Sequence, residues 1–430
     1  MRWMVSTAIV VLLASCASCR TGAEKPPTKG AAESMTVAEN VSESSDSTHS
    51  NDVCGFSEPV PLGAPDNDGM VRVPPAHPDI RYGGRIDCTD PEALRFSHVG
   101  VTVKMGFTGS KVGMQLTDFG ISKQPNYYTI VIDDGVPRPL EVSPGEHFYL
   151  LADNLGDGRH TIEVFKRTEN GTDYQHNNGK GIFSGFFIPK AGSVHSLAAK
   201  RRRVAFIGDS VTCGYGNGIA TAYPDKHPYT SANQDAYFAY GAVAARILDA
   251  SYMAVAYSGR GMVRNYSGVE GKTIPQMYLD ILPDDPQPGR WDPKRYTPDL
   301  VVINLGTNDF SVGISETDAP ALRERFTEAY AQFLETLRDY YPEAVFILGV
   351  GPMLSDEWPV GVNALTSVKT ALETVLAGRR SVGDEKVHIL EHEPQRSPFG
   401  EDWHPTAARH RIMADELLRR IDALKVFQGL

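Results

Sequence analysis

Four short segments of the chain carry side chains that could together perform acyl transfer. Ser210, in a Gly-Asp-Ser sequence, offers a hydroxyl nucleophile, and His404, in a Glu-Asp-Trp-His-Pro sequence, offers an imidazole that can accept its proton. Gly259 belongs to a Tyr-Ser-Gly-Arg-Gly sequence and Asn308 to a Gly-Thr-Asn-Asp sequence. The backbone N–H groups of a tight turn and a side-chain amide can stabilise an oxyanion. The four segments therefore offer the kinds of group that acyl transfer uses.

Each segment has a simpler interpretation when it is considered alone. A serine after a strand often caps a helix, a glycine-rich turn can be only a tight connection, and a lone histidine before a helix is more often structural. The Gly-x-Ser-x-Gly elbow of the α/β-hydrolases is absent around Ser210. A common site requires that the four segments fall at the same edge of a predicted sheet.

Apolar strands alternate with amphipathic helices after residue 203. This pattern predicts a parallel sheet covered by helices on both faces, an α/β fold of three layers. Active sites in such sheets lie beyond the carboxyl ends of the strands, which is where all four segments stand. The predicted strands are 204–207, 252–256, 299–304, 344–348 and 387–390, and the predicted helices are 234–250, 321–340 and 407–424.

The preceding region, from about residue 81 to 190, has the two-residue period of β-structure. Alternating segments at 98–105, 111–116, 127–132 and 160–165 are separated by Asp-Gly turns. Six or more strands without a convincing helix predict an all-β, jelly-roll-like sandwich. We therefore divide the folded chain into a β-sandwich domain over residues 56–195, with its core from about residue 80, and an α/β domain over residues 200–430.

The first 55 residues do not have the pattern of a folded domain. Residues 1–15 combine one positive charge, a short apolar run and small residues, which is typical of a secretory signal peptide. The Leu-Ala-Ser-Cys sequence that ends at Cys16 resembles a bacterial lipobox and predicts lipidation there, with ordinary signal cleavage as the alternative. Residues 16–55 are rich in Ser, Thr, Glu, Ala and Pro and predict a disordered tether. We expect an exported protein, anchored to the bacterial cell envelope by lipid and facing outward or into the periplasm.

The remaining cysteines give weaker signals. Cys16 and Cys19 form a C-x-x-C pair, but no strand or helix pattern around them supports a redox site. Cys54 and Cys88 could be joined in an exported chain, although the sequence does not fix the distance between them.

Composition and charge exclude several classes of protein. The 430 residues carry 42 Lys and Arg against 53 Asp and Glu, a net charge of −11, which argues against binding nucleic acid. No apolar stretch reaches the roughly 20 residues of a membrane-spanning helix. The glycine-rich residues 214–218 lack the lysine of a phosphate-binding loop, and the His-Glu pair at 392–393 is isolated. We therefore expect no metal and no cofactor.

The α/β domain resembles the SGNH (GDSL-type) hydrolases, whose sequence blocks contribute Ser, Gly, Asn and a C-terminal His. Longer sequences at 207–216, 257–261 and 304–310 resemble one branch, carbohydrate esterase family 2, whose members are acetyl esterases acting on plant polysaccharides such as xylan and glucomannan. That family also places a β-sandwich before the catalytic domain. The resemblance covers about residues 80–430.

The resemblance implies a role for each matching residue. Ser210 would be the nucleophile, and His404 would act as general base and then general acid. The oxyanion donors would be the backbone N–H groups of Ser210 and Gly259 and the side chain of Asn308. We prefer Gly259 to Gly261 because the Ser-Gly sequence matches the second SGNH block.

The resemblance leaves the partner of the histidine open. SGNH enzymes usually carry Asp three residues before the His, where this chain has Glu401. We favour Asp402, then Glu401, and then a Ser–His dyad in which a backbone carbonyl orients the imidazole. Trp403 is a candidate wall for stacking a sugar, with packing beneath the last helix as the alternative.

These features are consistent with three different functions. The first is a monomeric esterase that removes O-acetyl groups from polysaccharide by a Ser-His-(Asp) mechanism. The second is an esterase for acetyl groups of lipid or the cell envelope. The third is a carbohydrate-binding lipoprotein that has lost catalysis, which the intact Ser210, Asn308 and His404 argue against.

Overall fold

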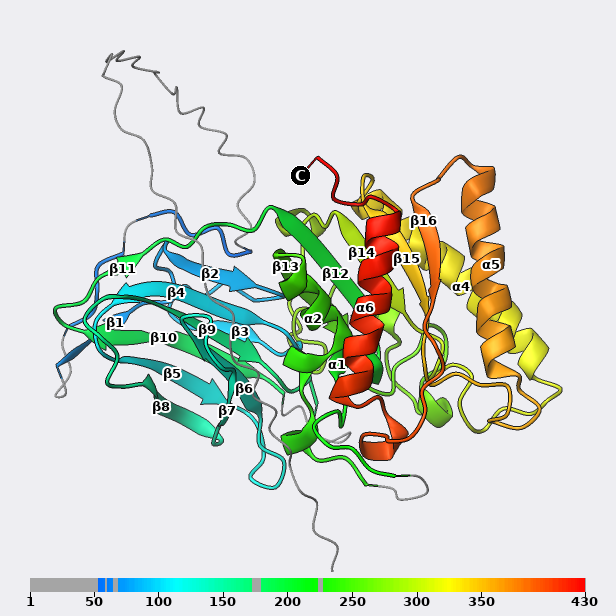
Figure 1. Ribbon diagram of the computed structural model, residues 1–430, viewed down its shortest axis with the longest axis horizontal. Coiled ribbons are helices and arrows are strands. Elements are labelled where there is room, and N and C mark those ends of the chain that lie inside the picture. Colours follow the sequence, from blue (N-terminus) through cyan, green and yellow to red (C-terminus); the bar gives the residue numbers. More distant parts are fainter. Residues whose placement is uncertain (1–52, 59, 65–68, 172–178, 223–226, 430) are drawn as a thin grey trace, which may run out of the picture. The chain divides into compact units, whose positions relative to one another are not determined.

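The computed structural model describes residues 53–58, 60–64, 69–171, 179–222 and 227–429. The predicted signal peptide, almost all of the predicted tether, Cys16 and Cys19 lie outside the described residues. Antiparallel strands form the described chain up to residue 195, and strands alternate with helices from residue 202 (Figure 1).

The N-terminal region is a sandwich of two antiparallel sheets. Its strands are β1 (Met70–Val73), β2 (Ile80–Gly83), β3 (Leu94–Phe96), β4 (Thr102–Thr108), β5 (Val112–Asp118), β6 (Tyr127–Ile132), β7 (Arg138–Glu141), β8 (Gly145–Ala152), β9 (Arg159–Lys166), β10 (Gly181–Pro189) and β11 (Val194–His195). One sheet has the order β1-β10-β5-β8, and β3 also pairs with β10. The other has the order β11-β4-β9-β6-β7, and β2 also pairs with β4. Inward-facing side chains of both sheets, such as Phe107 and Phe186, form the core between them.

The C-terminal region contains a parallel sheet built from apolar strands. These are β12 (Arg202–Gly208), β13 (Ala250–Ala256), β14 (Leu300–Asn304), β15 (Val345–Val350) and β16 (Val387–Glu391). Their order is β13-β12-β14-β15-β16, and every neighbouring pair is parallel. Strands β12, β14 and β15 are flanked on both sides, whereas β13 is an edge strand.

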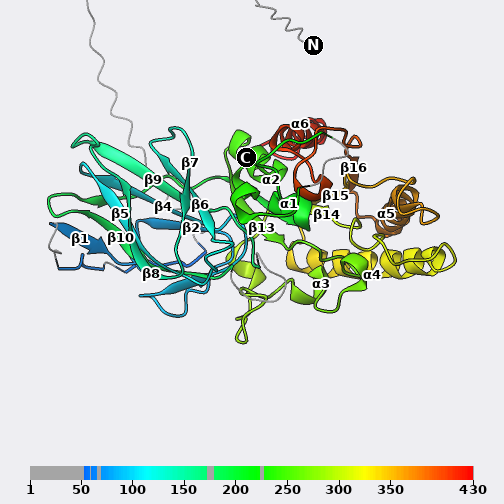
Figure 2. The same cartoon turned by 90° about the horizontal axis from the view of Figure 1, so that it is seen from below.

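Helices cover both faces of this sheet (Figures 1 and 2). The α-helices are α1 (Ser210–Cys213), α2 (Tyr240–Ile247), α3 (Ile274–Met277), α4 (Ala319–Tyr340), α5 (Ala364–Ser381) and α6 (Ala407–Ala423). Helices α2 and α6 pack with Phe206 on one face, and α4 and α5 pack with Ile303 on the other. Short 3-10 helices lie at η1 (Ser231–Asn233), η2 (Ala236–Phe238), η3 (Tyr266–Gly268), η4 (Pro293–Arg295) and η5 (Glu401–Trp403). The predicted fold class, a three-layer SGNH-type domain after an antiparallel sandwich, is confirmed.

One predicted helix differs from the structure, and one long helix was not predicted. The helix expected over 234–250 is helical only from Tyr240, because the carboxylate of Asp235 accepts the N–H of Tyr237 at 3.1 Å and starts a 3-10 turn. Ala239 is then extended, with φ −68° and ψ 151°, and interrupts the helical path. Helix α5 was not among the predicted elements.

The two regions share partly buried contacts. Arg295 of the α/β region donates to the carbonyl of Val53 at 2.8 Å and to Cys88 Sγ at 3.0 Å. Cys88 is joined to Cys54 by a disulfide with a Cα–Cα distance of 5.7 Å, so the pairing that the sequence left open is present. Among the helices of the described residues, none has both the length and the apolar character needed to cross a membrane.

Candidate active site

Ser210 stands on the turn that joins β12 to α1. Asp209 caps this short helix by accepting the N–H of Val211 at 3.1 Å, and Ser210 is its first residue. The turn is tight: a Cβ on Gly208 would meet Thr212 Oγ1 at 2.0 Å. The serine is therefore held at the carboxyl edge of the sheet with 6% of its surface exposed.

His404 lies within hydrogen-bond distance of the serine. Its Nε2 is 2.8 Å from Ser210 Oγ, and its Nδ1 is 3.0 Å from the carbonyl oxygen of Glu401. Because a carbonyl can only accept, the Nδ1–H donates to it, and Nε2 is left to accept the serine proton. The two residues, 194 positions apart in the sequence, thus lie at the distance that proton transfer between them would require.

The segment before His404 is fixed by a buried carboxylate. Glu401 is 1% exposed and accepts hydrogen bonds from the Thr230 N–H at 2.8 Å, the Thr230 hydroxyl at 2.7 Å and Asn233 Nδ2 at 2.7 Å. Asp402 and Trp403 then adopt the left-handed conformation, with φ of 47° and 60°. Such a conformation is unfavourable for residues other than glycine and persists only where the surroundings enforce it. The Glu401 side chain thus anchors the loop whose carbonyl orients His404.

Asp402 contacts a tyrosine next to the imidazole. Its Oδ2 accepts the hydroxyl of Tyr215 at 2.7 Å, and the Tyr215 ring lies against His404 with 4.2 Å between ring centroids. The Nδ1–H of His404 itself donates to the Glu401 carbonyl, as in the third of the arrangements that the sequence left open. A catalytic role for Asp402 stays a prediction.

The surroundings of His404 favour its neutral form. Burial lowers the pKa of His404 to about 4, against the hydrogen bond to Glu401 and the charge of Asp402, which raise it. A neutral imidazole is the form that can accept a proton from Ser210.

Gly259 lies in a four-residue turn after the edge strand β13. The Arg260 N–H donates to the Tyr257 carbonyl at 3.3 Å, and Gly259 has φ 75°, which a residue with a side chain rarely adopts. Ser258 donates from its N–H and its hydroxyl to the carboxylate of Glu169, at 2.7 and 2.5 Å. The turn is therefore held from both its ends.

Asn308 follows β14 and contacts both the turn that carries Ser210 and the turn that carries Gly259. Its Nδ2 donates to the Arg260 carbonyl at 2.9 Å and lies 3.3 Å from Asp209 Oδ2, next to Ser210. Burial raises the pKa of Asp209 to about 7, although its hydrogen bond from Val211 N–H lowers it. The structure thus brings Ser210, Gly259, Asn308 and His404 to one edge of the sheet; the catalytic roles of these residues stay predictions.

Several residues near this site were not singled out from the sequence. Tyr215 and Glu169 touch His404 and the Gly259 turn, respectively, and the buried Asp309 accepts the N–H groups of residues 262–264 at 2.7 to 3.0 Å. Asp309 directly follows Asn308, which is the one local signal available. Trp403 is 41% exposed beside His404, so its side chain is not packed in the core.

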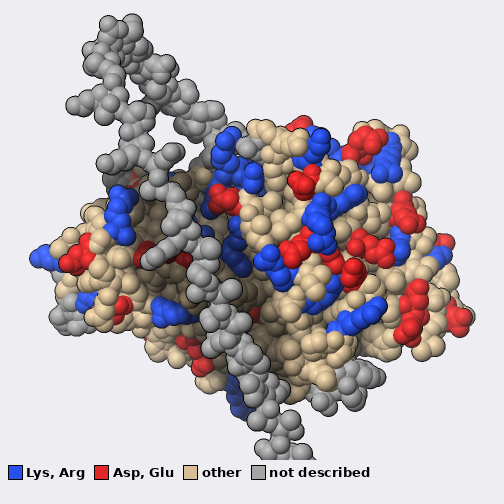
Figure 3. All heavy atoms as spheres, in the orientation of Figure 1, with Lys and Arg blue, Asp and Glu red and all other residues tan. Residues whose placement is uncertain are grey.

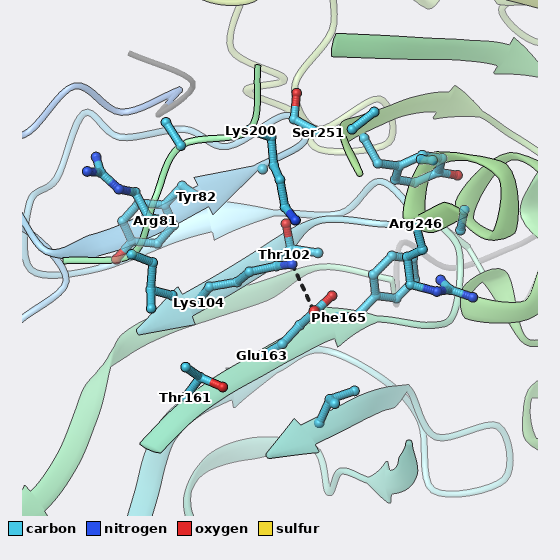
Figure 4. Close-up of a pocket in the computed structure, with 18 of the residues that line it drawn as sticks. Arg81, Tyr82, Thr102, Lys104, Thr161, Glu163, Phe165, Lys200, Arg246 and Ser251 are labelled. Carbon is cyan, nitrogen blue, oxygen red and sulfur yellow. Dashed lines mark ion pairs between the residues drawn. The ribbon is translucent and has the colours of Figure 1, made fainter. Parts of the chain in front are cut away.

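A separate pocket opens between the sandwich and the α/β region (Figure 4). Its lining includes Ser251 at the start of β13, the end of the strand opposite to the Gly259 turn. On its sandwich wall, Lys104 of β4 and Glu163 of the neighbouring strand β9 form an ion pair at 2.8 Å. Neither Ser210 nor His404 lines this pocket.

The fold and the Ser–His geometry define the class of SGNH-type ester hydrolases. Residues 206–412 match the GDSL-like lipase/acylhydrolase family, and residues 82–196 match the carbohydrate esterase 2 N-terminal family. A solved family two carbohydrate esterase from Clostridium thermocellum, in complex with cellohexaose, is 32% identical with a TM-score of 0.71, over 81% of this chain and 100% of that chain. The chain belongs to carbohydrate esterase family 2.

Two further relatives agree with this family assignment. The cellulase/esterase CelE of Acetivibrio thermocellus is 35% identical over 350 residues, which are 80% of this chain but only 39% of CelE. An acetylxylan esterase / glucomannan deacetylase of Cellvibrio japonicus is 26% identical over 341 residues, 79% of this chain and 87% of that protein.

The lowered pKa of His404 predicts activity that persists into acid. The base is neutral above its pKa, so kcat/KM should fall only as the pH drops through about 4, rather than through the ordinary histidine value of about 6.5. The measurement is kcat/KM against pH for an uncharged acetate ester. A half-maximal point at or above the ordinary histidine value would contradict this environment for His404.

The hydrogen bond to the Glu401 carbonyl predicts unequal roles for the two acids. Asp402→Asn should lower kcat less than about tenfold, whereas loss of a triad aspartate typically lowers it about 10⁴-fold. Glu401→Gln should lower kcat more than Asp402→Asn, because an amide NH₂ would face donors from Thr230 and Asn233. The check is kcat for both variants on one acetate ester. A loss near 10⁴-fold in Asp402→Asn would instead establish a Ser-His-Asp triad.

Proposed function

We propose that this chain is a serine esterase that removes O-acetyl groups from polysaccharide such as xylan or glucomannan. The observation that carries the proposal is the 2.8 Å contact between Ser210 Oγ and His404 Nε2, at the carboxyl edge of the sheet of a family 2 carbohydrate esterase. A polysaccharide substrate is supported by two relatives. The one from Cellvibrio japonicus is an acetylxylan esterase / glucomannan deacetylase, and the structure from Clostridium thermocellum is in complex with cellohexaose.

The proposed reaction proceeds through an acetyl-enzyme. Ser210 Oγ attacks the acetyl carbonyl carbon while its proton passes to His404 Nε2, and the carbonyl oxygen takes the negative charge. The N–H groups of Ser210 and Gly259 and the Asn308 amide stabilise that charge, the amide exchanging its longer contact with Asp209. The C–O bond to the sugar breaks as His404 returns the proton to the sugar oxygen. Water then repeats the sequence, and acetate leaves.

The surface agrees with an uncharged substrate. On the face shown in Figure 3, basic and acidic side chains are interspersed rather than gathered by sign. An O-acetylated neutral glycan needs no concentrated positive charge for recognition, whereas a polyanion does. Trp403, exposed beside His404, offers an aromatic ring to a sugar.

Acetate release with and without the nucleophile tests the proposed function. We expect the protein to release acetate from acetylated xylan or glucomannan, and Ser210→Ala to lower kcat by about 10⁶-fold because no hydroxyl remains to form the acetyl-enzyme. Ser381→Ala, at the exposed end of α5, is the matched control and should keep wild-type activity. An active Ser210→Ala variant would refute the mechanism. Acetate released from peptidoglycan but from neither plant polysaccharide would refute the substrate class.

We also propose that the protein is exported and anchored by lipid at Cys16. The Cys54–Cys88 disulfide supports export, because such bonds persist mainly in oxidising compartments. In bacterial cells the wild-type protein should fractionate with the membrane, and Cys16→Ser should move it to the soluble fraction. Cys19→Ser is the matched control and should stay with the membrane. Equal membrane association of wild type and Cys16→Ser would exclude the anchor.

A further inference from the structure

A buried segment of the sandwich enters the α/β region beside the active site. Residues 166–170, which begin at the last residue of β9, are each at most 9% exposed. Arg167 donates to the carbonyls of Gln234 and Ala232 at 2.7 and 2.8 Å and forms an ion pair with Asp235 at 3.2 Å. The segment is thereby fixed against the loop that precedes α2.

Glu169 is the member of this segment that reaches the Gly259 turn. Its Oε2 accepts the Ser258 N–H at 2.7 Å, and its Oε1 accepts the Ser258 hydroxyl at 2.5 Å and Gln234 Nε2 at 3.2 Å. The Cys213 thiol also bonds to the carboxyl group. Every one of these partners is a donor, which matches the acceptor-only capacity of a carboxylate. Burial raises the pKa of Glu169, while the bonds from Ser258 and the charge of Lys166 lower it.

The position of the turn explains why such a contact matters. The turn follows β13, the edge strand, so on one side no strand of the sheet flanks it. On this part of the edge the sandwich segment contributes the neighbours: Asn170 Nδ2 donates to the carbonyl of Ala256 at 3.4 Å, and Glu169 takes both donors of Ser258. Ser258 is the residue directly before Gly259, and their shared peptide carries the Gly259 N–H.

We infer that Glu169 is a positioning residue for the oxyanion hole. Its carboxylate holds Ser258, and through it the Gly259 N–H, at the place where the carbonyl oxygen of the substrate develops charge. A donor that is displaced loses most of its effect on the transition state while substrate binding changes little. The inference rests on the proposed function, since it concerns the oxyanion of that reaction. It also gives the sandwich a direct part in catalysis.

A pair of matched variants tests this role. Glu169→Gln keeps the shape but places an NH₂ group among the donors of Ser258, Gln234 and Cys213. It should lower kcat on an acetate ester by about 10- to 100-fold with KM changed by no more than about twofold, as for a weakened oxyanion donor. Glu163→Gln, the same substitution on β9 at the Lys104 ion pair, is the control and should keep wild-type kcat (Figure 4).

A second variant separates positioning from general stability. Ser258→Ala removes the hydroxyl contact but keeps the backbone N–H, so it should lower kcat less than Glu169→Gln, and the double variant should be no slower than Glu169→Gln alone. The low-pH limit of kcat/KM should stay where it is in the wild type, because His404 is untouched. Should Glu169→Gln fail to fold, Ser258→Ala still decides, and an unchanged kcat in that variant overturns the inference.

The outcomes also separate this inference from the proposed function. A wild-type protein without esterase activity overturns both. An active wild type with a Glu169→Gln variant of equal kcat overturns the inference alone. Additive losses in the double variant, or a KM that rises as much as kcat falls, would show general damage to the interface and would also overturn it.

Discussion

The hydrogen bond between Ser210 and His404 is the constraint on which the rest of the structure depends. A serine hydroxyl becomes a useful nucleophile only within reach of a base, here 2.8 Å, and the two residues are 194 positions apart. Ser210 lies just after the end of strand β12, at the edge of the sheet, and His404 lies at the same edge in the loop before α6. The parallel sheet solves this problem because all its strands end on one side.

Buried carboxylates fix the loops at that edge. Asp209, Glu169 and Asp309 each accept backbone N–H groups, and burial raises the pKa of each. Removing a charge from water is unfavourable, and hydrogen bonds from N–H groups offset that loss while ordering the loop that supplies them. The turn at Ser210, the turn that carries the proposed Gly259 donor and the loop at residues 262–264 each donate to such a carboxylate. The donors are the N–H groups of Val211, Ser258 and residues 262–264.

The fold class could be predicted from the sequence, and so could the position of four segments at one edge of the sheet, because apolar strands and their ends are local patterns. The sequence was not sufficient where a contact spans two regions. Nothing near Glu169 in the chain indicates that its carboxylate will meet Ser258, 89 residues later. The sequence left three alternatives for the partner of His404, because the acceptor in the structure is the backbone carbonyl of Glu401, a group that every residue possesses. The helix predicted over 234–250 begins only at Tyr240 for a different, local reason, because the Asp235 carboxylate competes with helix formation.

The edge position of β13 links these observations to the presence of a sandwich. In the sheet, β12 and β14 have neighbours on both sides, so the turns that carry Ser210 and Asn308 are flanked by other strand ends. The turn after β13 lacks that support on one side, yet it carries the proposed Gly259 donor. A donor in an oxyanion hole must be placed before the reaction, since reorganisation during the reaction removes its advantage. The sandwich segment at 166–170 supplies buried contacts on that side. The β-sandwich therefore completes the edge of the α/β domain. An α/β domain alone would contain every proposed catalytic group, but it would lack the contacts that hold the Gly259 turn in place.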